Sequence, residues 1–137
     1  MKAARLILRP PGGAFPGVDA ALAATADLQR EQLLHLEWLA DGTYAMLYQL
    51  AGDRGAIRDV LADHDEVIDF DLVPGAEAAG EPTVYCFVHA EERETLSTLL
   101  AIAEDRALLL EPPFVVTEEG IAVTLAGEAG SLQAAFA

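Results

Sequence analysis

Several short stretches of the chain alternate between hydrophobic and polar positions, and this period of two predicts β-strands. In residues 3–9, Ala4, Leu6 and Leu8 fall on one face of such a strand. The Pro-Pro-Gly-Gly sequence that follows is expected to end it. Residues 66–73 alternate in the same way. The apolar side chains of this second strand that are expected to face the core are Ile68, Phe70 and Leu72.

Other stretches carry apolar residues three and four positions apart, which is the spacing of one face of an α-helix. Residues 18–28 form one predicted helix, with Asp19 in its first turn, where a carboxylate is favoured. Asp53 can cap a second helix over residues 54–62. The same spacing predicts two further helices, over residues 91–105 and 129–136.

Two turns that contain glycine predict β-hairpins. Asp41-Gly42 is a strong hairpin signal between the strands predicted over residues 32–40 and 43–50. The sequence Glu118-Glu119-Gly120 joins two further strands in the same way. The remaining expected segments are a loop over 74–82, a strand over 83–89, and the second hairpin's strands over 114–117 and 120–126.

The order of these elements is β-α-β-β-α-β followed by β-α-β-β-α. It predicts an α+β fold of two ferredoxin-like units, residues 1–73 and 81–137, with helices on one face of each antiparallel sheet. A GAF-like α+β domain is the alternative. The length of 137 residues suits one domain made of two such repeats. The second unit lacks its final strand, which we expect just beyond Ala137.

Charge changes what this fold can be used for. The chain has 23 acidic and 8 basic residues, a formal net charge of -15, and a hydrophobic fraction of 53%. Disorder requires low hydrophobicity, so the acidic residues are expected on the surface of a folded domain. Such a surface repels phosphates, so we expect no direct contact with nucleic acid. Self-repulsion is screened by salt, and we expect unfolding midpoints to rise between about 0.1 and 2 M KCl.

The location of the protein follows from three further features. The single cysteine, Cys86, excludes an internal disulfide. The apolar stretch near the N-terminus is too short and too charged for a signal peptide, and no apolar run approaches the length of a membrane span. We expect a soluble, cytoplasmic protein.

Two arginines and two aspartates are candidates for one cluster. The first and last strands of a ferredoxin-like unit are antiparallel neighbours, which would set Arg5 and Arg9 beside Asp69 and Asp71. A solvated, salt-bridged sheet face is the plainer interpretation. The functional one is an arginine pair that binds an anionic metabolite.

Histidine, glutamate and cysteine supply few options for a metal. His35 and Glu37 are two positions apart and share one strand face, whereas His64 is expected at a helix C-terminus and His89 at a strand end. No HxxxH or CxxC motif is present, so we predict no metal site and no cofactor. Cys86 alternates with apolar residues and is interpreted as a small core residue.

Five aromatic residues on the predicted strands are either core or the lining of a ligand cavity. They are Trp38, Tyr44, Tyr48, Tyr85 and Phe87. The candidate ligand-binding residues are therefore Arg5, Arg9, His35, Glu37, Trp38, Tyr44, Tyr48 and Tyr85. No nucleophile or phosphate-loop motif is present, so we do not expect an enzyme.

The sequence LLHLEWLADGTYAMLYQL over residues 33–50 is the most distinctive of the chain. Together with residues 87–127, which include LLLEPPF, and with the acidic ADHDEV over residues 62–67, it resembles the regulatory domain of the haloarchaeal bacterio-opsin activator family. The resemblance extends from Ala3 to Ala137. It implies a helix-turn-helix transcription regulator whose DNA-binding helices follow this domain. This chain itself contains no helix-turn-helix.

Three functions follow as hypotheses. The first is a regulatory domain that senses a small molecule or forms a homodimer and thereby controls its own C-terminal DNA-binding domain. The second is a small enzyme that uses His35 and Glu37 as an acid/base pair. The third is an oligomerisation module without a ligand.

Overall fold

A computed structural model describes residues 2–15, 17–75, 82–91 and 109–128. Within these ranges the chain forms an α+β fold of one antiparallel sheet and two short α-helices. In chain order the elements are β1 (Lys2–Leu8), the 3-10 turn η1 (Pro11–Gly13), α1 (Val18–Ala23), β2 (Leu28–Trp38), β3 (Tyr44–Gly52), α2 (Arg54–Asp63), β4 (Val67–Pro74), β5 (Thr83–Ala90), β6 (Leu109–Val116) and β7 (Ile121–Gly127).

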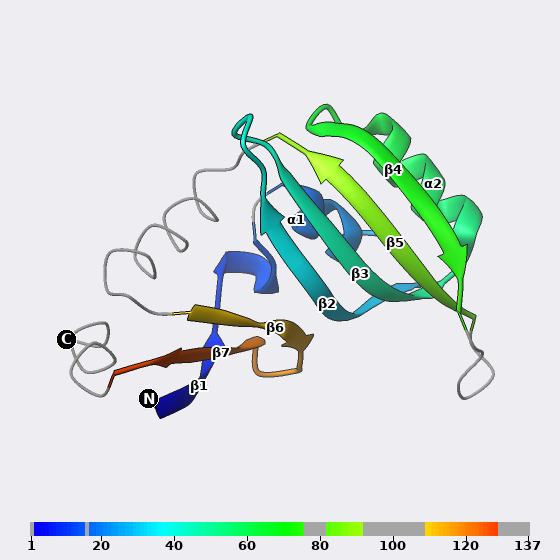
Figure 1. Cartoon of the computed structure of the whole chain (residues 1–137). Helices are drawn as coiled ribbons and strands as arrows, with labels where there is room; N and C mark the ends of the chain where they lie inside the picture. The colour runs from blue at the N-terminus through cyan, green and yellow to red at the C-terminus, as the bar shows by residue number, and fades with distance from the viewer. Residues whose placement is uncertain (1, 16, 76–81, 92–108, 129–137) are drawn as a thin grey trace.

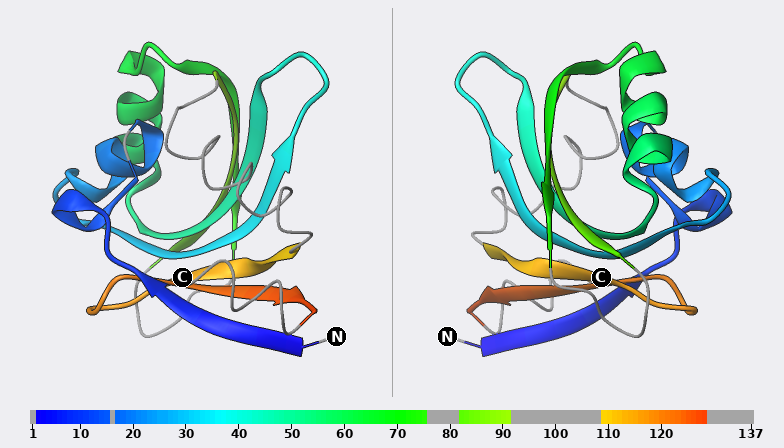
Figure 2. Two further views of the ribbon diagram at one scale, coloured as in Figure 1. Left: turned by 90° about the vertical axis from the view of Figure 1, so that its left-hand side faces the viewer. Right: turned by 90° about the vertical axis from the view of Figure 1, so that its right-hand side faces the viewer.

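The seven strands lie in the order β1-β7-β6-β2-β3-β5-β4. We call β2, β3, β4 and β5 the four-stranded part, and β1, β6 and β7 the three-stranded part. They meet where β2 pairs with β6, in only two register pairs, Gln32 with Val115 and Leu33 with Phe114. Helices α1 and α2 both lie on one face of the four-stranded part, and the three-stranded part runs across its end (Figures 1 and 2).

Most of these elements are predicted by short stretches of neighbouring residues. The hairpin predicted at Asp41-Gly42 is present, and Gly42 has a positive φ of 86°. The predicted capping by Asp53 is confirmed, because its Oδ2 accepts a hydrogen bond of 3.1 Å from the backbone N–H of Ala56. Helix α1 is shorter than predicted because Asp27 takes a positive φ of 60° and β2 begins directly after it.

The hairpin of β6 and β7 is also present, but β6 begins earlier than predicted. It includes Pro112 and Pro113, and its register with β7 shifts between Glu111 and Val115. Proline lacks the N–H that a ladder needs, so an irregular register at this pair is expected. The helices predicted over residues 91–105 and 129–136 fall almost wholly on residues outside the described ones.

One predicted core residue of β4 is wrong. Ile68 is 51% exposed, whereas Phe70 and Leu72 pack against the core as predicted. The cause is a β-bulge, since Val67 pairs with Ala90 but Asp69 already pairs with His89. The extra residue shifts the alternation by one position, so Val67 takes the inward place expected of Ile68.

The arrangement of two separate ferredoxin-like units is not what the described residues form. Strand β5 lies between β4 and β3, where the prediction put β1, and β1 pairs instead with β7. Side chains explain the exchange. Strand β5 is mostly buried, as a central strand must be, whereas β1 carries exposed Lys2 and Arg5, which suit a sheet edge.

The core lies between the helices and the sheet. Tyr44, Met46, Tyr48 and Leu50 of β3 point into it, and Phe114 of β6 joins it from the three-stranded part. One hydrophobic cluster therefore spans both parts of the sheet. No helix in the described ranges is long and apolar enough to cross a membrane.

Candidate functional site

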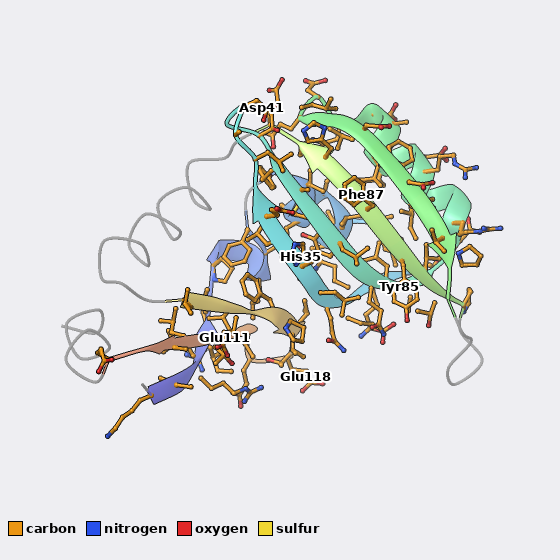
Figure 3. All side chains as sticks on the ribbon, viewed as in Figure 1. His35, Asp41, Tyr85, Phe87, Glu111 and Glu118 are labelled. Atoms are coloured by element: carbon orange, nitrogen blue, oxygen red, sulfur yellow. The ribbon has the colours of Figure 1, made fainter. Side chains whose placement is uncertain are left out.

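The face of the four-stranded part that is turned away from α1 and α2 is the candidate site, and we call it the outer face (Figure 3). Strand alternation decides which residues belong to it, since their neighbours in the chain point into the core. The cross-strand register then arranges them in rows. From β4 to β2 the rows are Asp69-His89-Ala45-Glu37, Asp71-Phe87-Leu47-His35 and Val73-Tyr85-Gln49-Gln32.

The middle of the outer face is apolar and partly open to solvent. Phe87 is 45% exposed between Leu47 and Asp71, and Val73 is 52% exposed beside Tyr85. Large apolar side chains that remain exposed next to one another and within a polar rim are typical of an interaction surface.

The rim of the outer face is acidic. Asp69 and Asp71 stand on β4, and Glu37 stands on β2. Glu31 lies in a bulge of β2, and its Oε2 accepts a hydrogen bond of 3.5 Å from Gln49 Nε2. The three rows contain no lysine or arginine. Their only groups that can become cationic are two histidines.

His35 and Glu37, predicted to share a strand face, do so. His35 Nε2 lies 3.6 Å from Glu37 Oε2, with side-chain exposures of 56% and 61%. A contact this exposed stabilises the fold by less than about 1 kcal/mol. Both side chains are therefore available to a ligand.

A chain of hydrogen bonds at the end of the outer face links the β2–β3 turn to β5. Asp41 Oδ1 accepts from the Thr43 hydroxyl at 2.5 Å and from the Thr43 backbone N–H at 3.0 Å. The hydroxyl has only one proton to give, so in its 2.7 Å contact with His89 Nε2 the histidine is the donor. These bonds from Thr43, the hydroxyl first, together with the nearby His89, lower the pKa of Asp41.

The sequence did not predict these hydrogen bonds between Asp41, Thr43 and His89. Thr43 and His89 are 46 residues apart, and only the pairing of β3 with β5 brings them together. The Asp41-Gly42 turn was a visible signal for the hairpin, but it carried no information about which strand would lie beside it.

Two of the predicted tyrosines point the other way. Tyr44 and Tyr48 are buried on the helix side of β3, and the hydroxyl of Tyr48 donates to Asp19 Oδ1 at 2.8 Å. Burial first, and then the charge of Asp19, raises the pKa of Tyr48 well above its usual value. Of the other predicted aromatic residues, Tyr85 and Phe87 lie on the outer face. Trp38 pairs with Tyr44 through its backbone, and its side chain is outside the described part of the structure.

The expected cluster of arginines and aspartates does not form. Arg5 lies on β1 opposite Thr124, and Arg9 follows that strand, whereas Asp69 and Asp71 lie on β4. Strands β1 and β4 are the two opposite edges of the sheet. The predicted pairing failed because β1 joins β7.

Cysteine and histidine do not form a metal centre in the described residues, where no three histidine, cysteine, aspartate or glutamate side chains are grouped for it. The core position predicted for Cys86 is confirmed, and burial, together with the charge of Asp71, raises its pKa to about 12. His64 ends α2 as predicted, and its Nδ1 accepts from the backbone N–H of Glu66 at 3.2 Å.

A groove of about 450 Å³ lies elsewhere, where the end of α1 meets β2 and the β6–β7 turn. Its lining residues are Ala23, Leu28, Gln29, Arg30, Val116, Thr117 and Glu118. None of the predicted ligand-binding residues lines it. The outer face, which holds His35, Glu37 and Tyr85, remains the better candidate.

A comparison with protein families gives one relation. The family model described as "HVO_0513_N, N-terminal" matches residues 17–137, which include every strand except β1. No curated protein and no solved structure matches the chain.

Proposed function

The chain belongs to the HVO_0513_N, N-terminal family, and on this premise we propose that it is the regulatory domain of a DNA-binding transcription regulator. The observation that carries the proposal is the outer face, an accessible acidic surface with an apolar centre. Two further points support it. The family description is that of an N-terminal domain, and residues 33–50 and 87–127 resemble the regulatory domain of the bacterio-opsin activator family.

The charge of the domain supports the proposal that another part of the protein reads DNA. A net charge of -15 repels the phosphate backbone, whose attraction to lysine and arginine supplies most non-specific affinity for DNA. In this proposal a C-terminal helix-turn-helix contacts the promoter. The present domain controls it through a bound small molecule or through dimerisation.

The outer face is the part of the domain that would receive the signal. His35, Glu37 and Tyr85 combine two charged or polar groups and an aromatic ring on one accessible surface. Convergent polar groups around an apolar centre are what small-molecule sites use for orientation. We do not propose a catalytic role for His35 and Glu37, because both side chains are more than half exposed and neither lines the groove beside α1.

A promoter assay tests the proposal. The gene that encodes this domain is expressed with and without the H35A/E37A/Y85A triple substitution, and promoter occupancy and transcript levels are measured. We expect occupancy or transcription to change several-fold while the amount of protein stays constant. The matched control is D59N/D63N on exposed positions of α2, the far side of the sheet. Transcript levels that are identical in all three proteins would refute the proposal.

A ligand screen separates sensing from oligomerisation. A bound effector raises stability by RT ln(1 + [L]/Kd), about 2.7 kcal/mol at one hundred times Kd. We expect a thermal shift in 2 M KCl with at least one metabolite, and its loss in the triple variant. If sedimentation shows a dimer and no metabolite shifts the midpoint, dimerisation is the mode of control.

A further inference from the structure

The outer face is wide enough for one helix. Strands β4 and β2 are separated by three strand spacings, about 14 Å at roughly 4.8 Å each. An α-helix with its side chains is about 10–12 Å across. A helix that lies along the strands would cover the apolar middle row at Phe87 and Leu47. It would stand between the carboxylates of Asp71 on one side and Glu37 on the other.

Charge decides what kind of helix fits. Asp69, Asp71, Glu31 and Glu37 line the two sides, and no lysine or arginine stands in the rows between them. A second copy of the same face would place like charges opposite one another, which is unfavourable where they come into direct contact. Nucleic acid and anionic lipid are repelled for the same reason. A cationic partner meets no such penalty.

We propose that the outer face docks a cationic amphipathic helix, whose apolar stripe covers Phe87 and whose arginine and lysine side chains meet the carboxylates on β2 and β4. This inference rests on the proposed function, which supplies the partner, namely a helix of the attached DNA-binding part. Docking would occupy cationic side chains that otherwise contact phosphate. The domain would then hold its own DNA-binding part in an inactive state until a signal releases it.

Salt sets which contacts matter most. At molar ionic strength the Debye length is about 3 Å, so only charges in direct contact still attract one another. The apolar contact at Phe87 is not screened. We therefore expect Phe87 to contribute more to affinity in 2 M KCl than in 0.2 M KCl, relative to the aspartates.

The test is a titration of the protein with a synthetic peptide in 1 M KCl, in which fluorescence anisotropy measures binding. The probe is an 18-residue helix-forming peptide with leucine on one face and arginine on both flanks. A second peptide has the same composition in an order that gives no apolar stripe. The protein variants are F87S and D69N/D71N, with D59N/D63N on α2 as the control of equal charge change. Circular dichroism verifies that each variant is folded. If F87S does not fold, D69N/D71N alone tests the proposal.

We expect a saturable complex whose Kd rises at least tenfold in F87S and in D69N/D71N, and at least tenfold for the peptide without a stripe. The Kd of D59N/D63N should stay within twofold of the parent. Three results would each overturn the docking proposal. The Kd could rise equally in the α2 control D59N/D63N, it could stay unchanged in both F87S and D69N/D71N, or binding could fail to saturate up to about 1 mM peptide. The titration contains no DNA, so its failure leaves the proposed function standing. A failed promoter assay beside intact peptide binding would remove the regulatory role instead.

Discussion

The four-stranded part and the three-stranded part belong to one sheet but are built differently. The four-stranded part carries both helices, the buried polar cluster around Asp19 and the outer face. The three-stranded part consists of the β6–β7 hairpin and β1, which together pair the start of the chain with its far end. Only two register pairs connect the parts, yet the core is continuous through Phe114.

The difference shows that the buried polar contacts and the strands that complete the sheet lie in different parts of the fold. In the four-stranded part Asp19 accepts three hydrogen bonds, from the Phe15 backbone N–H at 2.9 Å, from Arg30 at 2.7 Å and from Tyr48 at 2.8 Å. These bonds fasten α1 to β2 and β3. The strands of the three-stranded part are held by backbone ladders and apolar side chains. Side-chain hydrogen bonds occur there at Thr117 in the β6–β7 turn, which is not buried in the core.

The largest effect is expected from D19A. It leaves the guanidinium of Arg30, whose side chain is only 9% exposed, without its carboxylate. Breaking a buried pair in this way costs about 3–5 kcal/mol of unfolding free energy. Urea unfolding in 2 M KCl measures the loss. Hydrogen exchange on β6 and β7 then shows whether the three-stranded part opens together with the four-stranded part. The exposed D59A on α2 should change stability by less than about 0.5 kcal/mol.

Removing the side chain at the junction tests the coupling from the other side. Phe114 is buried opposite Leu33, so F114A should cost about 3–5 kcal/mol through lost burial and the cavity that remains. If the junction couples the parts, urea curves followed by tryptophan fluorescence and by circular dichroism should separate in this variant. L109A, on an exposed position of the same strand, should leave both curves unchanged. Coincident curves in F114A would argue against the junction as the link.

Two glycines allow a matched comparison of the parts. Gly52 (φ 144°) and Gly120 (φ 149°) have backbones that other residues rarely adopt. A Cβ would meet the Asp27 carbonyl oxygen at 2.7 Å in the first and overlap that of Leu8 in the second. We expect G52A and G120A to cost about 1–3 kcal/mol each. Gly12, with φ 74° and open space, is the control, so G12A should cost less than either. If G12A is as unstable as the other two variants, the positive φ alone accounts for the loss of stability, and the close approach of the Cβ does not contribute.

The smallest effect is expected from D53A, which removes the cap of α2. Loss of such a cap typically costs about 1 kcal/mol. Thermal unfolding should register it as a shift of a few degrees. D53N keeps an oxygen acceptor and should retain most of the stability. If D53N is as unstable as D53A, charge rather than the hydrogen bond to Ala56 accounts for the cap.

Sequence reasoning was reliable where the signal is local. The Asp41-Gly42 hairpin, the cap at Asp53 and the burial of Cys86 each follow from a few neighbouring residues, and each is present. The bulge that exposes Ile68 was not visible, because an extra residue in a strand depends on the register with its partner.

The candidate site was predicted only in part, for a related reason. His35 and Glu37 share a face because two positions along one strand always do so, and Tyr85 joins them through the register of β5. Arg5 and Asp69 were expected together on the basis of a topology that the sheet does not have. Which side chains from distant strands lie together depends on which strand is central in the sheet. A strand can be central only if its side chains can be buried on both faces.

The pairing of β1 with β7 also has a consequence for how the protein is made. Lys2 lies opposite Gly127, so the first strand described pairs with the last strand described, and it leaves the ribosome well before its partner. At roughly 5–20 residues per second, β1 is exposed for on the order of ten seconds before its partner exists. Contacts this distant in the chain form slowly, because a long loop must close first. Exposed charges such as Lys2 and Arg5 of β1 are of the kind that discourages an unpaired strand from pairing with a wrong neighbour.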